Sequence, residues 1–493
     1  IITNPTNIAT GNIKLSFNEY IKLKDLNKQL VISPPMKYAP LITPQGFASE
    51  YLNIEIVDTL QKNTTYIINF GNSIEDNNEN NPLERFKYVF STGKYIDSLK
   101  YTGRIKDALL EKPNKDFNVL LYRIDSTYTD SIVYKEKPSY VTTTTDSINF
   151  KFTNLKEGKY FLVALKENQN DYIFDPKLDN IGFYKDTIQL PKDTILNTSL
   201  SVFKETQPFK FGRAKESKKG QIIFPFYGEQ KDLKATIISD VPKDFKSISK
   251  FEKEKDTLNY WFTPFEVDSL NFIVTNKDLI DTITVRLRKK KLDSLTINPS
   301  TRGSLNFRDT FYLKTNNPLI KIDTSKISLM NKDSVFVKFE SIINQKENKV
   351  AFVFEKKPVQ SYDLSILPKA FEDIYNFKND TLKYKMRTKE IEDFGRITLK
   401  IENIASKNYI IELLDAKLNI VQRNYINNTT TVVYDLLEAK TYTLRAIEDL
   451  NKNNIWDTGN FLQRRLPEKI IYFSDEPLEV RPNYYLNPTF ILN

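Results

Sequence analysis

The stretch Ala446-Ile-Glu-Asp-Leu-Asn-Lys-Asn-Asn-Ile-Trp-Asp457 occurs twice in this chain, because Ala164-Leu-Lys-Glu-Asn-Gln-Asn-Asp-Tyr-Ile-Phe-Asp175 aligns with it without a gap. Each copy follows a run headed by a tyrosine, Tyr160-Phe-Leu-Val in one case and Tyr442-Thr-Leu-Arg in the other. Self-similarity between distant segments indicates a chain built from repeated modules. The stretch therefore predicts the same kind of domain at both places.

The repeat extends upstream of this stretch. Gly103-Arg-Ile105 recurs as Gly395-Arg-Ile397, and the segment from Thr65 to Asp76 has a counterpart from Tyr362 to Asp373. A two-domain unit, an A domain followed by a B domain, thus occurs twice around a central domain. The predicted boundaries are 1–97 (first A), 98–205 (first B), 206–293 (central), 294–390 (second A) and 391–493 (second B).

The composition favours strands throughout. The 493 residues include 27 Tyr and 33 Phe, and aromatic and β-branched residues are enriched in strands. Alternating segments such as Asn12-Ile-Lys-Leu-Ser-Phe17 and Leu52-Asn-Ile-Glu-Ile-Val57 recur at intervals of roughly 8–15 residues without a sustained helical period. The sequence predicts an all-β fold, a string of about five antiparallel β-sandwich domains.

The residues that are absent exclude several kinds of chemistry. The chain has no Cys and no His, which removes disulfides, zinc sites built on these residues, cysteine nucleophiles and Ser-His-Asp triads. Only 13 residues are Gly, no Gly-rich phosphate loop is present, and no Ser lies in a nucleophile-elbow context. We therefore expect that the protein is not an enzyme.

The net charge of +9 arises from 72 basic and 63 acidic residues, a small excess for this length. The only dense basic run is Arg286-Leu-Arg-Lys-Lys-Lys291. Such a run is typical of nucleic-acid or anionic-lipid binding, or of a solvated strand end that leads into a linker. No aromatic stacking platform surrounds it, so we favour the solvated strand end and expect no nucleic-acid partner.

The second copy of the repeated stretch is a candidate calcium loop. With Asp449 as position one, Asn451, Asn453 and Asp457 fall at positions three, five and nine, and the carbonyl of Ile455 falls at position seven. Alternating oxygen ligands of this kind suit calcium in an EF-type loop. Position six is Asn454 rather than Gly, and position twelve is Asn460 rather than Glu, although Glu468 is available to supply a carboxylate from outside the loop.

The first copy places Glu167, Gln169, Asp171 and Asp175 at the corresponding positions. Its first two side chains are one methylene longer, so we rank it below the second copy as a metal site. For both loops the alternative is a set of Asx turns in which the side chains cap backbone amides without metal. If calcium binds, we expect it to have a structural role in stiffening a long loop.

Asp followed by Ser or Thr, and then by an aliphatic residue or Thr, is strongly over-used. Turn chemistry explains the pattern, because Asp and Ser or Thr favour turns and the aliphatic residue begins the next strand. The hydroxyl residues concerned are Thr59, Ser98, Ser126, Ser131, Ser147, Thr187, Thr194, Thr257, Ser269, Thr282, Ser294, Ser334 and Thr381.

Two family resemblances follow from these residues. The first A domain, with Ile13-Lys-Leu-Ser-Phe17, Asn63-Thr-Thr-Tyr66 and the closing Phe90-Ser-Thr92, resembles bacterial Ig-like domains of the SbsA or Big type. The B domain, with its opening Gly-x-Ile and the signal Leu155, Gly158 and Tyr160, resembles the prealbumin-type sandwich of carboxypeptidase regulatory domains and adhesin repeats. In adhesin repeats of this type, the loop after the Tyr strand binds calcium.

Taken whole, the chain is similar to the Ig-like-domain surface lipoproteins of Bacteroidota. This resemblance implies an extracellular protein held on the outer membrane by a lipid on a residue upstream of Ile1, where we expect a processed or trimmed N-terminus. It also implies O-glycans at the Asp-Ser and Asp-Thr positions. No run approaches the ~18–20 apolar residues of a membrane span.

Two functions are compatible with these observations. The first is a non-catalytic surface scaffold that binds other outer-membrane proteins, such as a β-barrel complex, with an accessory subunit of an outer-membrane protein or lipoprotein assembly machine as its narrower form. The second is a cell-surface adhesin or glycan-binding module. The second predicts exposed aromatic residues on loops, for which Tyr484-Tyr485 and Phe224-Pro-Phe-Tyr227 are candidates, although we expect both to be packed.

Overall fold

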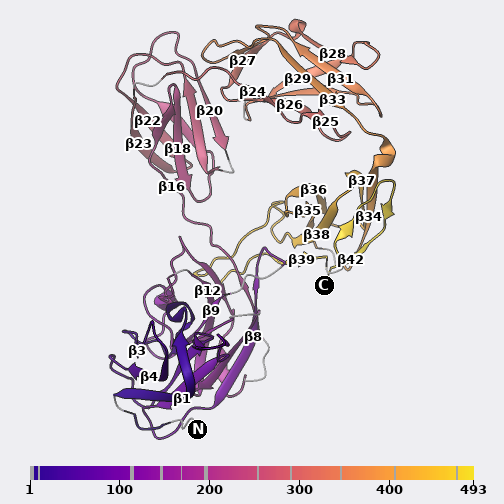
Figure 1. Cartoon of the computed structure of the whole chain (residues 1–493). Helices are drawn as coiled ribbons and strands as arrows, with labels where there is room; N and C mark the ends of the chain where they lie inside the picture. The colour runs from indigo at the N-terminus through magenta and orange to yellow at the C-terminus, as the bar shows by residue number, and fades with distance from the viewer. Residues whose placement is uncertain are drawn as a thin grey trace. The chain divides into compact units, whose positions relative to one another are not determined.

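The computed structural model describes residues 5–8, 11–111, 116–144, 148–167, 169–193, 198–252, 255–288, 291–344, 347–404, 407–473 and 476–492. These residues form many mainly antiparallel sheets, with one short α-helix, α1 (Leu26–Gln29), in the part described (Figure 1). The prediction of an all-β chain of sandwich domains is confirmed. No helix among these residues has the length and apolar character required to cross a membrane.

The chain divides into two compact units, which are described separately. The first unit contains Ile1–Glu205 together with Ile447–Tyr472, and the second contains Thr206–Ala446 together with Phe473–Asn493. The segment Ile447–Tyr472, which includes most of the repeated stretch of the second B domain, therefore packs with the N-terminal part of the chain. Nothing in the sequence predicted this assignment.

Two sheets form the first A domain. Alternation creates its core, since Leu52 and Ile54 are fully buried while their neighbours Tyr51 and Glu55 face outward. β1 is long and its register shifts between Ser16 and Ile21, so its first half pairs with β4 and its second half with β6. The sheets run β3 (Leu41–Thr43), β4 (Ser49–Glu55), β1 (Asn12–Leu23), β6 (Ile74–Asp76) and, separately, β2 (Val31–Ser33), β5 (Thr65–Gly71), β7 (Phe86–Ser91).

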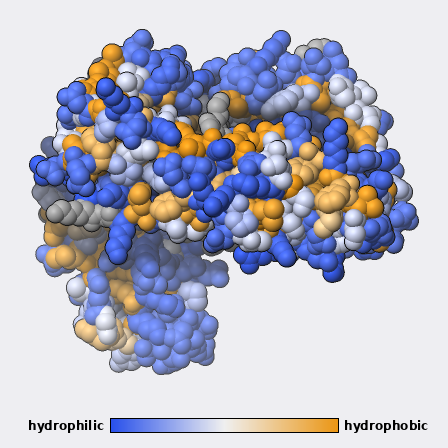
Figure 2. All heavy atoms as spheres, turned by 90° about the horizontal axis from the view of Figure 1, so that it is seen from above, coloured by the Kyte–Doolittle hydropathy of each residue, from blue (hydrophilic) through white to orange (hydrophobic). Residues whose placement is uncertain are grey.

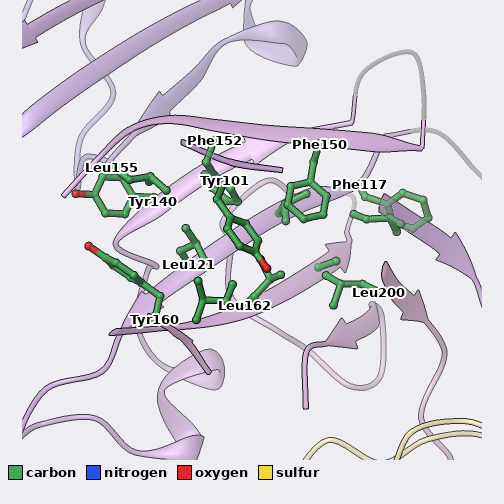
Figure 3. Packing of buried hydrophobic residues seen from close by; sticks show 14 of the residues in the cluster. Tyr101, Phe117, Leu121, Tyr140, Phe150, Phe152, Leu155, Tyr160, Leu162 and Leu200 are labelled. Atoms are coloured by element: carbon green, nitrogen blue, oxygen red, sulfur yellow. The ribbon is translucent and has the colours of Figure 1, made fainter. Parts of the chain in front are cut away.

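The first B domain is also a two-sheet sandwich. Tyr101, Phe150, Tyr160 and Leu162 project into the space between its sheets (Figure 3). One sheet contains β10 (Tyr140–Thr143), β9 (Asn118–Arg123), β12 (Gly158–Lys166) and β13 (Asn180–Phe183), with β14 (Ile188–Leu190) also on β12. The other contains β11 (Asn149–Leu155), β8 (Leu99–Asp107) and β15 (Thr198–Val202), with β15 parallel to β8.

The glycine of the repeated Gly-Arg-Ile motif lies where a parallel strand approaches closely. A Cβ added at Gly103 would lie 2.5 Å from the carbonyl oxygen of Thr198 on β15, which is far inside van der Waals contact. At Gly395 an added Cβ would lie 2.7 Å from the carbonyl oxygen of Arg481. The motif recurs because both B domains need a residue without a side chain at this crossing.

The two domains of the first unit contact each other directly. The amide of Val141 on β10 donates to the hydroxyl of Ser33 on β2 over 3.0 Å, and Lys137 donates to the carbonyl oxygen of Met36 over 2.9 Å. Val31 on β2 also belongs to a buried cluster of the first B domain. Packing and hydrogen bonds therefore fix the first A domain against the first B domain.

The segment Ile447–Tyr472 covers the outer face of the β10-β9-β12-β13 sheet. Phe461 is fully buried there, with its ring centroid 6.0 Å from that of Phe161 and 5.5 Å from that of Phe183. The guanidinium of Arg464 lies 4.1 Å from the Phe161 ring centroid and pairs with Asp130 in the 3₁₀ helix η1 (Asp130–Tyr134). This segment is called the cover below.

The second unit contains the central, second A and second B domains. In the second A domain the single long strand of the first A domain is replaced by two shorter ones, β26 (Phe311–Thr315) and β27 (Leu319–Ile322). The central sheets are β16 (Lys210–Phe211), β18 (Gln221–Tyr227), β21 (Thr257–Phe262), β20 (Ser247–Glu252), with β17 (Lys215–Lys218) on β18, and β19 (Lys234–Ile237), β22 (Ser269–Asn276), β23 (Leu279–Arg286). The remaining second-A strands are β24 (Ile297–Pro299), β25 (Gly303–Ser304), β28 (Ile327–Asn331), β29 (Phe339–Asn344), β30 (Lys349–Phe354), β31 (Ser361–Ile366), β32 (Phe371–Asp373) and β33 (Leu382–Arg387).

The second B domain repeats the strand order of the first. β37 (Thr431–Glu438), β34 (Phe394–Glu402), β41 (Tyr485–Leu486) and β42 (Thr489–Ile491) form one sheet, in which β41 and β42 run parallel to β34. β36 (Ile420–Ile426), β35 (Tyr409–Asp415) and β38 (Thr441–Glu448) lie in the other, with β40 (Leu478–Glu479) on β38. Tyr160 and Tyr442 each donate their hydroxyl to the carbonyl four residues earlier, over 2.9 and 3.0 Å.

Candidate functional site: a polar cleft in the first unit

A cleft of about 1300 Å³ opens between the first A and first B domains. Its walls come from α1, β5 and β7 of the A domain and from β8, β9, β10 and β11 of the B domain, together with the loop after β12. All of these elements belong to the same compact unit. The interface between the two domains therefore creates a large hollow.

Strand alternation places polar side chains on the wall formed by β8 and β11. Tyr101 on β8 and Phe150 on β11 point into the core, so the residues next to them in each strand point outward. The antiparallel register then pairs Lys151 with Thr102 and Asn149 with Arg104 on this outer face. All four of these outward residues line the cleft.

Cations gather in the cleft without enough anions to balance them. Five basic residues line it against two acidic ones, Asp116 and Glu167. Burial lowers the pKa of Lys87 on β7, and the nearby charges of Lys151 and Arg85 lower it further. Among the described residues, the side chains of Lys87, Arg104 and Lys151 have no ion-pair or hydrogen-bond partner.

Glu167 is the one carboxyl that is drawn into the cleft wall. Burial raises its pKa to about 7, with a smaller contribution from Asp171. It accepts hydrogen bonds from Asn118 Nδ2 over 3.1 Å and from the amide of Tyr172 over 3.2 Å. Asn118 also donates to Asn170 Oδ1 over 3.1 Å, so this side of the cleft is a linked polar network.

The first repeated loop therefore contributes to the cleft rather than forming a ring of oxygen ligands. Of its predicted ligands only Glu167 lines the cleft, and Gln169 is exposed. Asp171 accepts from the amide of Ile173 over 2.9 Å, and Asp175 accepts from that of Lys177 over 2.8 Å. These are Asx turns, the alternative that the sequence left open.

The second repeated loop is closed by its own hydrogen bonds. Asp449 is buried and accepts from the amides of Asn453 and Asn454 over 3.1 and 3.0 Å. Asp457 accepts from the side-chain amides of Asn451 and Asn453 over 2.6 and 2.7 Å. Ile455, whose carbonyl was the predicted ligand at position seven, donates its amide to Asn453 Oδ1 over 2.9 Å.

Glu468 does reach this loop from outside, but it binds backbone amides. Its two oxygens accept from Leu450 over 2.8 Å and from Asp457 over 3.0 Å. Burial raises the pKa of Glu468. No group of three His, Cys, Asp or Glu side chains suited to a metal ion occurs in the described ranges. This donor set fits a hydrogen-bonded loop better than a calcium site, and calcium binding stays a prediction.

The predicted glycosylation positions differ in accessibility. Thr257 is buried and its hydroxyl donates to the carbonyl of Lys255 over 2.7 Å, so the folded chain does not present this hydroxyl to solvent. Ser131 and Ser269 are half-buried, and Ser147 and Thr194 lie outside the described residues. The exposed positions are Thr59, Ser98, Ser126, Thr187, Thr282, Ser294, Ser334 and Thr381.

The aromatic residues proposed for glycan binding are divided between core and surface. Phe224 and Phe226 are buried, whereas Tyr227 is 63% exposed. Tyr484 and Tyr485 are also exposed, so the expectation that they are packed was wrong for this pair. No sequence motif marked the cleft, because its cations come from distant strands and each looks like an ordinary surface residue.

The comparisons with known proteins support the fold of the N-terminal region. The bacterial Ig-like domain family matches residues 2–92. No curated protein matches the chain. The family match covers the first A domain and agrees with the resemblance seen in the sequence.

Several solved structures are similar to the chain at low identity. Surface layer protein SbsC, domains 1-6, is 12% identical with a TM-score of 0.16, and the match covers 96% of this chain and 66% of that one. The major pilin subunit BcpA of Bacillus cereus is 11% identical with a TM-score of 0.16, covering 80% and 99%. The SGBP-B protein of Bacteroides ovatus, solved with a mixed-linkage heptasaccharide, is 12% identical with a TM-score of 0.18, covering 78% and 93%. At such TM-scores these structures carry no argument about function.

Proposed function

We propose that this chain is a non-catalytic binding protein of the cell surface and that the cleft of the first unit holds its ligand. The observation that carries the proposal is the cleft itself, a hollow of about 1300 Å³ in which three cations, Lys87, Arg104 and Lys151, have no ion-pair partner among the described residues. A binding site is where a protein keeps such groups unsatisfied, because folding alone favours pairing them.

The same residues favour binding over catalysis. The chain has no His or Cys, so a general base in the cleft would be a carboxylate or a lysine of lowered pKa such as Lys87. Glu167 has a pKa suited to that task, but both of its oxygens accept hydrogen bonds from the cleft wall. Asp116, the other acidic residue of the lining, is exposed. In this arrangement the cleft groups orient and hold a ligand, and Lys87 serves as a cationic contact.

The proposed location is the outer surface of an outer membrane, with a lipid anchor upstream of Ile1. Support comes from the match of residues 2–92 to bacterial Ig-like domains and from the resemblance to surface lipoproteins. Exposed hydroxyls at Asp-Ser and Asp-Thr positions, such as Ser98 and Thr282, are compatible with attached O-glycans. Intact-mass measurement of protein purified from its native envelope tests the glycans directly.

Binding to an array of neutral and acidic glycans tests the proposed function. The wild type is compared with the cleft variant Lys87→Gln/Lys151→Gln and with the control Lys62→Gln/Lys159→Gln. The control changes two exposed lysines of the same unit that do not line the cleft. We expect glycan binding by the wild type and the control and a loss of binding in the cleft variant. Absence of any glycan binding, or equal binding by all three proteins, contradicts the proposal.

A scaffold function is the second candidate, and one feature of the second unit favours it. β36 is an edge strand of its sheet, and Ile420, Val421 and Tyr425 are each about half exposed along it. An exposed edge strand with apolar side chains can accept a strand from a partner protein. Hydrophilic and hydrophobic residues are interspersed on the surface drawn in Figure 2.

A pull-down from native membranes tests the scaffold function. Recovery of a stoichiometric outer-membrane complex would favour it, provided that the complex is lost in Val421→Lys and retained in Val241→Lys. Val241 is the matched control because its exposure, 39%, is close to the 46% of Val421. The narrower hypothesis of an accessory subunit of an assembly machine receives no support from the comparisons. A β-barrel assembly complex in the recovered material is the result that would revive it.

A further inference from the structure

We infer that the ligand of the cleft is an acidic oligosaccharide, a short chain of sugars that carry carboxylates. This inference rests on the proposed function and narrows it to one class of ligand. It follows from three properties of the cleft: the charges of its walls, its neutral hydrogen-bonding groups, and its size.

The charges call for an anion. Lys87, Arg104 and Lys151 come from three strands of two domains, and their side chains lack partners within the described residues. Repulsion between Lys87, Lys151 and Arg85 opposes the charged state of Lys87. A carboxylate placed among these groups would relieve the repulsion and form charge-assisted hydrogen bonds, which are about twice as strong as neutral ones.

The neutral groups call for a hydroxylated ligand. The outward face of β8 and β11 interleaves its two cations with Thr102 and Asn149, and β10 adds Thr142 and Thr143. Side-chain amides and hydroxyls both donate and accept, so they match the paired donors and acceptors of sugar hydroxyls. Each of these two strands alternates a cation with a hydroxyl or an amide, which fits a polymer in which carboxylates alternate with hydroxyls.

The size of the cleft and the small number of large apolar side chains in its lining disfavour other ligands. A volume of about 1300 Å³ exceeds the ~300–1,000 Å³ typical of small-molecule sites, so a single sugar or a free anion would leave most of it empty. Val31 and Phe150, the large apolar residues of the lining, are buried. An acidic peptide would find no apolar pocket for its side chains, although it could pair with the edge strand β7.

Calorimetric titration of the full chain with hexagalacturonate tests the inference. We expect binding that weakens by about tenfold or more in Lys87→Gln/Lys151→Gln and is unchanged in Lys62→Gln/Lys159→Gln. Binding should also weaken several-fold as NaCl rises from about 20 mM to about 500 mM, because salt screens the cations. Thermal unfolding checks that the variants fold, and Arg104→Gln provides an independent loss of one cation.

The other outcomes separate the inference from the proposed function. Cellohexaose binding as tightly as hexagalacturonate, with the same loss in the cleft variant, overturns the acidic class but leaves the cleft as a glycan-binding site. Poly-glutamate binding equally well, with the same loss in the cleft variant, assigns the cleft to acidic peptides instead. Competition by inorganic phosphate at equal concentration would show that only charge is recognised and would also overturn the inference. If none of these anions binds at low salt, the inference of an acidic ligand is wrong, whatever the glycan array shows.

Discussion

The two B domains share a strand order but differ on the outer face of one sheet. In the first, residues Tyr160 to Leu165 of β12 are all buried, because the cover packs Phe461 and Arg464 on that face. In the second, β38 alternates between buried and partly exposed positions, and its outer side carries Arg445. A strand buried on both faces reads as a continuous apolar run, and a strand buried on one face alternates. The comparison shows that two domains with the same strand order differ in sequence according to what packs on the outer face of the sheet.

The corresponding sheet of the second B domain contains a cluster of three charged side chains. Glu412 on β35 is fully buried and accepts from Arg423 Nε over 2.7 Å and from Arg445 Nε over 2.6 Å. Two guanidinium groups thus shield one carboxylate where the first B domain has an aromatic cover. A buried ion cluster of this kind is costly to break, because each remaining charge loses its partner.

The largest expected effect is on the cover. Phe461→Ala removes a fully buried ring that contacts Phe161 and Phe183, and we expect it to lower the free energy of unfolding of the first unit by about 4 kcal/mol. Urea denaturation followed by tryptophan fluorescence measures this change. Trp456 lies in the cover and Trp261 in the central domain, so each reports on a different unit.

Phe47→Ala is the control, because that ring lies in the same unit and is 67% exposed, so its loss should change the free energy of unfolding by less than about 0.5 kcal/mol. The Trp261 signal should not shift in Phe461→Ala. If the two substitutions cost the same, the cover does not stabilise the first unit and the comparison between the B domains fails.

The second prediction concerns Glu412. Glu412→Ala leaves Arg423 and Arg445 without their carboxylate, and we expect a loss of about 3 kcal/mol in the free energy of unfolding of the second unit. Glu479→Ala, which breaks an exposed pair with Arg481, should cost less than about 1 kcal/mol. Urea denaturation read at Trp261 compares the two, and equal losses would mean that the cluster is no more than a surface pair.

Parts of this comparison were predictable from the sequence. The apolar run Tyr160-Phe-Leu-Val-Ala-Leu165 against the alternating Tyr442-Thr-Leu-Arg-Ala-Ile447 already indicates two buried faces in one copy and one in the other. What lies on the second face is not local information, since Phe461 is about 300 residues away from Phe161 in the chain. Alternation is a local signal, so the sequence predicted the all-β class and the first Ig-like domain. The cover depends on contacts between distant segments, so the sequence did not predict it.

The cleft was unpredictable for a related reason. Lys87 and Lys151 lie on edge strands of different domains, and each follows the ordinary rule that outward strand positions are polar. Only the packing of β2 against β10 brings them to one hollow. The repeated loop was found easily, but its contacts in the fold were not predictable. Its weaker copy lines the cleft through Glu167, and its stronger copy satisfies its own amides.

The third prediction uses the pH dependence of Glu167. Its pKa of about 7 lies above the ordinary 4.5, so its contribution to stability is fully present below pH 4.5 and is lost as the pH rises through about 7. The side chain of Glu167→Gln is neutral at every pH. The free energy of unfolding of this variant, relative to that of the wild type, should therefore rise by on the order of 1 kcal/mol between pH 4.5 and pH 8, after allowance for partial solvent screening.

Urea denaturation at the two pH values, read at Trp456, measures this gain. The groups that act on Glu167 are the carboxylate of Asp171, the amide of Asn118 and the backbone amide of Tyr172. Asp171→Asn is the control, because it removes only the smaller electrostatic contribution and should change the pH dependence less. A stability difference that does not vary with pH would place Glu167 in solvent rather than in the cleft wall.

The smallest expected effect distinguishes the two loops by calcium. Asp449 stands where the first loop has Glu167, and its carboxylate already accepts two backbone amides. Asp449→Asn should therefore lower the free energy of unfolding by about 1 kcal/mol, whether or not calcium is present. Thermal unfolding of wild type and variant, with and without millimolar calcium, measures this. A gap between the two proteins that widens when calcium is added would show that the carboxylates of Asp449, Asp457 and Glu468 rearrange around the ion. In that case the second loop is the metal site that its spacing suggested, and the two copies differ in chemistry as well as in surroundings.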